Sequence, residues 1–115
     1  MKHEMKVQPI YFNKIKTGEK IYEVRLNDEK RRSIDVGDFI IFKNTNQNEE
    51  LCTKVKDLIY FDSFDEMVNT LPSEKIGFCD MDKTEIVKVY NEFYTQEDEE
   101  KLGVVAIKIE PMASI

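Results

Sequence analysis

Three charged side chains of complementary type lie within the six residues from Lys20 to Arg25. Lys20, Glu23 and Arg25 follow Gly18, a residue type that commonly ends a helix. A lysine whose pKa is depressed by burial can accept a proton, and a carboxylate can activate water. An arginine presents a planar fork to a phosphate, carboxylate or carbonyl oxygen. These three residues therefore form the candidate functional site.

Alternation along a strand predicts how these side chains are presented. Residues 21–26 read as a strand, which places Glu23 and Arg25 on one face and an apolar set on the other. Lys20 lies at the start of that strand, where its long side chain can reach over a cleft on the face that carries Glu23 and Arg25. A neighbouring arginine would hold Glu23 ionised. The alternative is a surface ion pair that contributes about 0–1 kcal/mol and binds no ligand.

The first half of the chain reads as one helix followed by three strands. Gly18 is placed to end the helix in a left-handed conformation, and Gly37 supplies the unusual backbone angles of a tight turn. The expected elements are a helix over 11–17, a strand over 21–26, a charged connection or helical turn over 27–33, a turn at 36–38, a buried strand over 39–42, a polar loop over 44–50 and a long strand over 51–61.

The second half turns helical and then returns to the sheet. Ser63, Asp82 and Thr95 have the residue types and positions of helix caps, so three helices are expected before a strand over 104–109. The second of these helices places four apolar side chains on one face, Ile86, Val89, Tyr90 and Phe93. Because the last strand must join the sheet made by the first strands, the order predicts an α+β domain with a curved, mostly antiparallel sheet, a small barrel.

Length and charge limit the class of protein. The chain has 115 residues, which predicts a single domain over 1–115 with its core at about 10–110. The net charge of −6 argues against a protein that coats long nucleic acid through phosphate contacts. Lysine and arginine are concentrated in the first third, which indicates a local basic face. No apolar run approaches the ~18 residues that cross a bilayer, so no membrane association and a cytoplasmic location are expected.

The few cysteines and histidines exclude several kinds of site. Cys52 and Cys79 lie far apart in the sequence and are expected to be reduced thiols. His3 is the only histidine, and we expect it to lie in a frayed terminus. We therefore expect no zinc site, no Ser-His-Asp or Cys-His nucleophile, and no metal or cofactor.

The pattern Gly-x-Lys-x-x-Glu-x-Arg, formed by Gly18, Lys20, Glu23 and Arg25, resembles the signature of the ASCH family. The turn at 36–38 and the strand at 103–107 also fit, and the resemblance runs from about residue 10 to 109. It implies a small PUA-like, mostly antiparallel β-barrel flanked by short helices, with a cleft beside the signature residues. It further implies binding of RNA, a nucleotide or a modified nucleoside.

One branch of that family hydrolyses the N4-acetyl group of acetylated cytidine with a lysine, a threonine and a glutamate. The resemblance implies that this lysine corresponds to Lys20, whereas the threonine falls at or beside Glu23, where this chain has no threonine. The separate glutamate comes from the later helical region, and Glu74, Asp80 and Glu85 are its possible counterparts. If the protein is an enzyme, Lys20 and Glu23 are the expected catalytic residues.

Two further groups have residue types that suit a nucleic-acid ligand. Four aromatic side chains could stack a base, although core packing is the commoner role of such residues: Tyr60, Phe61, Phe64 and Phe78. The basic run at 30–32 could contact phosphates, although a charged turn explains it as well.

Three functions follow from the sequence. The first is a binding module whose cleft, lined by Lys20, Glu23 and Arg25, receives RNA, a nucleotide or a modified nucleoside. The second is an amidohydrolase that removes an acyl group from a modified pyrimidine nucleoside such as N4-acetylcytidine. The third is a structural ion pair with no ligand.

Overall fold

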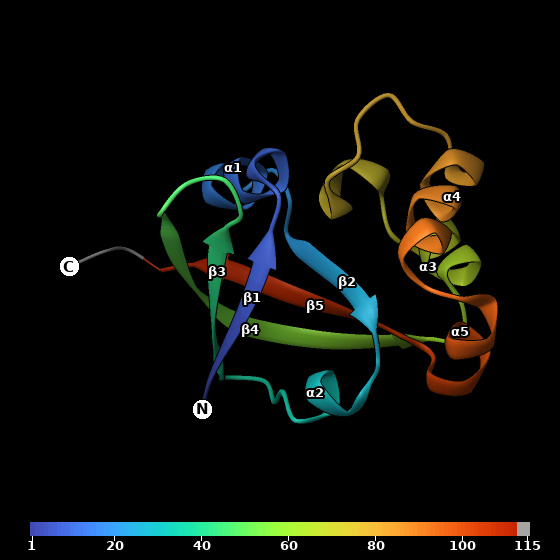
Figure 1. Ribbon diagram of the computed structural model, residues 1–115, viewed down its shortest axis with the longest axis horizontal. Helices are drawn as coiled ribbons and strands as arrows, with labels where there is room; N and C mark the ends of the chain where they lie inside the picture. Colours follow the sequence, from blue (N-terminus) through green and yellow to red (C-terminus); the bar gives the residue numbers. More distant parts are fainter. Residues whose placement is uncertain (113–115) are drawn as a thin grey trace.

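Five strands form one curled sheet in the order β1-β3-β4-β5-β2 (Figure 1), seen in a computed structural model that describes residues 1–112. The strands are β1 (Lys2–Val7), β2 (Tyr22–Leu26), β3 (Phe39–Asn44), β4 (Glu50–Phe61) and β5 (Val104–Pro111). β1 pairs with β3 in parallel, and the other pairings are antiparallel. The expected α+β fold with a curled, mostly antiparallel sheet is confirmed. The curl is open between its two edge strands, β1 and β2.

Short helices flank this sheet. They are α1 (Pro9–Thr17), α2 (Glu29–Arg32), α3 (Phe64–Thr70), the 3-10 helix η1 (Ser73–Ile76), α4 (Lys83–Phe93) and α5 (Gln96–Leu102). The side chains of Ser63, Asp82 and Thr95 each accept a hydrogen bond from the N–H three residues later, as their cap positions predicted. Gly18 ends α1 with a φ of 85°, which confirms the expected left-handed cap. Within residues 1–112, every helix is too short or too polar to cross a membrane.

Both faces of the sheet are covered, which determines where the charged residues of β2 lie. Val24 and Leu26 pack with the residues of α3 and α4 in one apolar cluster. The opposite face packs against α1, and Ile107, the cross-strand partner of Glu23, belongs to the cluster there. Because β2 is covered on both sides, Glu23 lies inside the fold rather than on an exposed face.

The N-terminal segment is a strand, and the expectation of a frayed terminus is wrong. β1 places Met5 and Val7 in the core, so the packed region begins before residue 10. His3 contributes its Nε2 atom to a contact of 2.9 Å with Oδ2 of Asp38. The same carboxylate accepts a hydrogen bond of 3.0 Å from the main-chain N–H of Asp35 and so fastens its own turn. A backbone pairing with β3, which is distant in the sequence, orders this polar segment.

One side chain of α4 departs from the predicted apolar face. Ile86 and Tyr90 are buried as expected, but Phe93 is 66% exposed. It is the last residue of α4 and borders a cavity. The exposed ring is therefore part of a surface feature rather than of the core.

Candidate functional site

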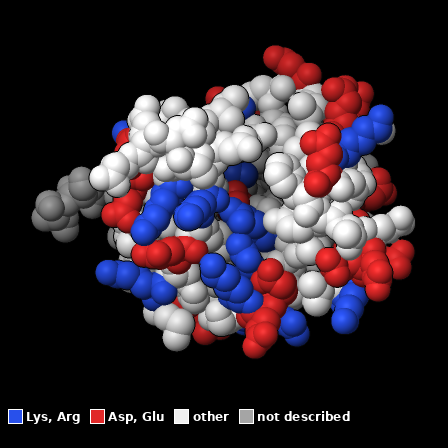
Figure 2. All heavy atoms as spheres, viewed as in Figure 1, with Lys and Arg blue, Asp and Glu red and all other residues white. Residues whose placement is uncertain are grey.

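A pocket of about 460 Å³ lies where the open edges of β1 and β2 face α4. Figure 2 shows it as a hollow with lysine and arginine atoms gathered beside it over β1. Its volume is within the range of small-molecule sites, roughly 300–1,000 Å³. The residues that line it are Lys6, Val7, Gln8, Tyr11, Lys20, Glu23, Val24, Arg25, Thr45, Phe78, Val89, Tyr90, Glu92, Phe93 and Tyr94.

Lys20 occupies the floor of this pocket. The chain turns at Gly18, and the main-chain N–H of Lys20 donates to the carbonyl of Lys14, which directs the residue inward. Its Nζ atom donates to the carbonyl oxygen of Ile76 across 2.8 Å and lies 3.2 Å from Oε1 of Glu23. The side chain is only 4% exposed. Burial lowers the pKa of Lys20 below its ordinary value, and Glu23 opposes this shift in part.

Gly77 makes room for the buried lysine. It has a φ of 100°, in the left-handed region, and a Cβ atom there would lie 3.0 Å from Cδ of Lys20. It would also lie 3.3 Å from a ring carbon of Tyr11. A side chain at position 77 would therefore strain the backbone and crowd the floor of the pocket.

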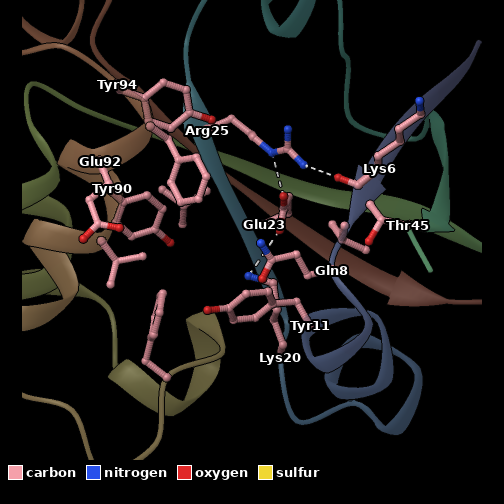
Figure 3. A pocket seen from close by; sticks show the side chains of 15 residues that line it. Lys6, Gln8, Tyr11, Lys20, Glu23, Arg25, Thr45, Tyr90, Glu92 and Tyr94 are labelled. Carbon is pink, nitrogen blue, oxygen red and sulfur yellow. Dashed lines mark hydrogen bonds and ion pairs between the residues drawn. The ribbon is translucent and has the colours of Figure 1, made fainter.

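Glu23 is shared by the two cations (Figure 3). Its Oε2 atom accepts a hydrogen bond of 2.6 Å from Nε of Arg25, and its Oε1 atom faces Lys20. Burial raises the pKa of Glu23, but the charges and hydrogen bonds of Lys20 and Arg25 outweigh burial and leave that pKa below its ordinary value. Glu23 is therefore ionised, and the three side chains carry one net positive charge.

Arg25 connects the two edge strands. Its Nη2 atom donates to the carbonyl oxygen of Lys6 in β1 across 3.0 Å, while its Nε atom holds Glu23. The side chain is 19% exposed, so part of the guanidinium remains accessible from the pocket. Lys20, Glu23 and Arg25 are thus brought together, as their spacing predicted, and they lie in a pocket rather than on an open surface.

Main-chain groups of Val24 also face the opening. Ile109 donates to the carbonyl of Ile21, and Asn27 donates to the carbonyl of Gly103, so the odd-numbered residues of β2 bond to β5. In an antiparallel pair the intervening residues direct their N–H and C=O groups away from the partner. Val24, which lines the pocket, therefore presents one donor and one acceptor toward it.

Aromatic side chains form the opposite wall. Phe78 packs edge-on against Tyr11 and Tyr90, with ring centroids 5.7 Å and 5.9 Å away. Figure 3 shows the Tyr11 and Tyr90 hydroxyl groups directed toward the cavity. Burial raises the pKa of Tyr90 well above its ordinary value, so its hydroxyl stays protonated and can donate. The exposed ring of Phe93 lies at the rim.

Among the aromatic candidates from the sequence, only Phe78 lines the pocket. Phe61 and Phe64 are buried in the core, which was the alternative role considered for them. Tyr60 is 59% exposed and borders a separate hollow beside α5. No pattern in the sequence marked Tyr90 and Phe93 of α4 as pocket residues, because their helical spacing is equally typical of core residues.

The remaining charged candidates lie away from the pocket. Glu74, Asp80 and Glu85 are exposed and do not line it, whereas Glu92 of α4 does. The basic run at 30–32 forms α2, where Arg31 pairs with Asp28 across 3.2 Å, and it does not reach the pocket either. Among residues 1–112, no three His, Cys, Asp or Glu side chains cluster closely enough to hold a metal ion.

Comparison with known protein families gives a match to the ASCH domain over residues 5–113. The chain belongs to the ASCH domain family. ASCH domains are generally thought to bind RNA. The match begins at β1, so the strand that carries Lys6 lies within the ASCH domain of this chain.

Solved structures resemble this ASCH domain along its whole length. The crystal structure of the hypothetical protein PH0355 is 46% identical, with a TM-score of 0.88, and the match covers 97% of this chain and 100% of that one. Protein PF0455 from Pyrococcus furiosus is 38% identical with a TM-score of 0.76 over 99% and 100% of the two chains. An ASCH domain from Lactobacillus crispatus shares the fold at 14% identity, with a TM-score of 0.67 over 96% and 79%. The search of curated proteins found no match.

Proposed function

We propose that the pocket binds one nucleotide unit of a short single-stranded RNA or a free nucleotide. The observation that carries this proposal is the meeting of a buried, net positive charge cluster with an aromatic wall in one cavity. Lys20, Glu23 and Arg25 supply the charges, and the tyrosine and phenylalanine rings supply apolar surface. Proteins that recognise single-stranded RNA combine these two features, because unpaired bases stack on aromatic rings and phosphates require cations.

The inner part of the pocket suits a base. A flat ring can lie against Phe78 and Tyr90, while its polar edge faces the N–H and C=O groups of Val24. The tyrosine hydroxyl groups add further hydrogen-bonding positions. Recognition of a base by main-chain groups does not depend on side-chain charge, which is consistent with a site whose own charges are largely paired.

Local charge explains how an acidic protein can hold an anionic ligand. The whole chain carries a net charge of −6, but three cations and two carboxylates line the pocket, which leaves one net positive charge there. A long duplex would bring many phosphates against the acidic remainder of the surface. A ligand of one or a few nucleotides meets mainly the positive site.

Titration of short fluorescent RNA by anisotropy at several salt concentrations tests the proposal. The wild type is expected to bind at low salt, and Arg25→Gln is expected to weaken binding. Arg32→Gln removes the same charge from the exposed α2 helix, outside the pocket, and serves as the matched control. Circular dichroism of both variants checks that they remain folded. Binding that is absent at low salt, or equally weakened by both variants, contradicts the proposed site.

A second candidate function is an amidohydrolase, favoured by the lowered pKa of Lys20 beside Glu23. In the fraction of molecules whose Lys20 has released its proton, which the lowered pKa enlarges, water would add to the acyl carbon of an N-acylated pyrimidine nucleoside while the uncharged amine takes its proton. The bond to the exocyclic nitrogen would then break, and the proton would pass to the departing nitrogen. Release of acetate from N4-acetylcytidine by the wild type, but not by Lys20→Ala, would establish this reaction. Absence of turnover at high enzyme concentration would exclude it.

A further inference from the structure

Two cations at one end of the pocket retain hydrogen-bonding capacity. Lys6 is exposed and has no ion-pair partner among residues 1–112. Arg25 uses Nε and Nη2 in protein contacts, and Nη1 has none among the described residues. Thr45 lies at the same end. It follows the last residue of β3, and its main-chain N–H donates to the carbonyl of Val7 in β1 across 3.1 Å, which holds the loop after β3 against β1.

We propose that Lys6, Arg25 and Thr45 form a phosphate subsite, so that the pocket distinguishes phosphorylated nucleotides from nucleosides. This inference rests on the proposed function and specifies the ligand of the same pocket. A free guanidinium nitrogen, an unpaired ammonium and a hydroxyl are the groups that bind a phosphate mono- or diester. Arg25 is already held on its other side by Glu23 and Lys6, which limits the freedom it loses when it binds.

The floor of the pocket is a poor place for the phosphate. Lys20 is engaged by the carbonyl of Ile76 and by Glu23, and its side chain is only 4% exposed. A phosphate there would also face the ionised carboxylate of Glu23. In Figure 3, Glu23 lies between Lys20 and Arg25, while Lys6 lies beyond Arg25. The phosphate is therefore directed to the outer end and the base to the inner end.

The opposite rim reinforces this orientation. Glu92 projects from α4, on the far side of the pocket from Lys6 in Figure 3. A phosphate beside Glu92 would meet a like charge, whereas one beside Lys6 would meet two cations. The charged groups around the opening therefore favour one orientation of the bound ligand, with its phosphate beside Lys6.

Isothermal titration of the full chain with the four common ribonucleosides, their 5′- and 3′-monophosphates and inorganic phosphate tests the subsite. We expect at least one monophosphate to bind about tenfold more tightly than its nucleoside, as one charge-assisted contact predicts. Lys6→Ala should remove most of that difference, because it should weaken the binding of the monophosphate more than the binding of the nucleoside. Thr45→Val, which removes only a hydroxyl from an exposed loop, should reduce the difference in part.

Lys43→Ala is the matched control. Lys43 lies opposite Lys6 on β3 but outside the pocket lining, paired with Glu4 and Glu50. The same protein titrated with a short RNA should lose about 0.7 from the slope of log Kd against log salt in Lys6→Ala only. Equal affinity for nucleosides and monophosphates, or equal effects of Lys6→Ala and Lys43→Ala, overturns the subsite while leaving the binding pocket intact. Absence of binding by every nucleoside, nucleotide and RNA overturns both proposals.

Discussion

Arg25 and Lys6 join the two open edges of the sheet, because the guanidinium of Arg25 donates to the main-chain oxygen of Lys6 across 3.0 Å. The two strands do not pair by backbone hydrogen bonds. The contact lies at the mouth of the pocket, next to the 2.6 Å hydrogen bond between Arg25 and Glu23. One arginine therefore supports the shape of the curled sheet and also presents charge to the cavity.

Replacing Arg25 should loosen β1. Arg25→Gln removes the bridge to Lys6 and one of the two cations that hold Glu23, so we expect a loss of unfolding free energy on the order of 3 kcal/mol. Native-state hydrogen exchange should show that this substitution accelerates the exchange of β1 amides, relative to the wild type, more than the exchange of β4 amides. Arg25→Lys keeps the charge, but a lysine lacks the planar fork that contacts Glu23 and the carbonyl of Lys6 together. This variant should therefore be more stable than Arg25→Gln and less stable than the wild type. Uniform acceleration in all strands would contradict the bridging role.

The charge of Glu23 should make the free energy of unfolding depend on pH in the acidic range. Its pKa in the folded protein lies below the ordinary value of 4.5, so its contribution is present above that pH and is lost as pH falls through the folded-state value. Glu23→Gln should be less stable than the wild type at neutral pH, since two buried cations lose their partner. Urea unfolding at a series of pH values should show the two proteins converging as pH decreases below 4.5. A constant difference across the series would contradict the ionised state of Glu23.

The exposed ring of Phe93 should matter for binding and little for folding. Phe93 is 66% exposed at the pocket rim, so Phe93→Ala is expected to change the stability by no more than about 0.5 kcal/mol. Loss of a stacking contact should weaken RNA binding by about 1–3 kcal/mol. Tyr60→Ala is a suitable control, because Tyr60 is 59% exposed but lines the other hollow. Equal effects of the two substitutions on RNA affinity would show that Phe93 has no specific role in binding.

Glycine 77 should be more sensitive to substitution than glycine 18. Both have positive φ, so alanine at either position strains the backbone by about 1–2 kcal/mol. Only Gly77→Ala adds a carbon 3.0 Å from Lys20, whereas the space beside Gly18 is open. Chemical denaturation should therefore show a larger loss for Gly77→Ala, and RNA titration should show weaker binding for this variant alone. Equal stability losses would indicate that Lys20 shifts without cost.

Local patterns predicted much of this fold. Helix caps such as Ser63 and Asp82 and the left-handed Gly18 act through neighbouring residues, so their positions in the sequence specify helix ends directly. The pairing of Glu23 with Arg25 was also predictable, since alternate residues of a strand share a face.

Contacts between distant segments were not predictable in this way. β1 contains only two apolar core residues, Met5 and Val7, and its order depends on parallel pairing with β3. Without β1, neither the Arg25–Lys6 bridge nor the basic rim of the pocket can be placed. Lys20 likewise depends on the carbonyl of Ile76, which lies 56 positions away in the sequence.

The central claim is that the pocket between β1, β2 and α4 receives the ligand. Amide chemical shifts of the labelled protein, measured during titration with a short single-stranded RNA, test it most directly. The largest changes are predicted at Lys6, Lys20, Val24, Thr45 and Phe93, which all line the pocket. Changes confined to the basic α2 helix or to the hollow around Tyr60, or no changes at low salt, would contradict the claim.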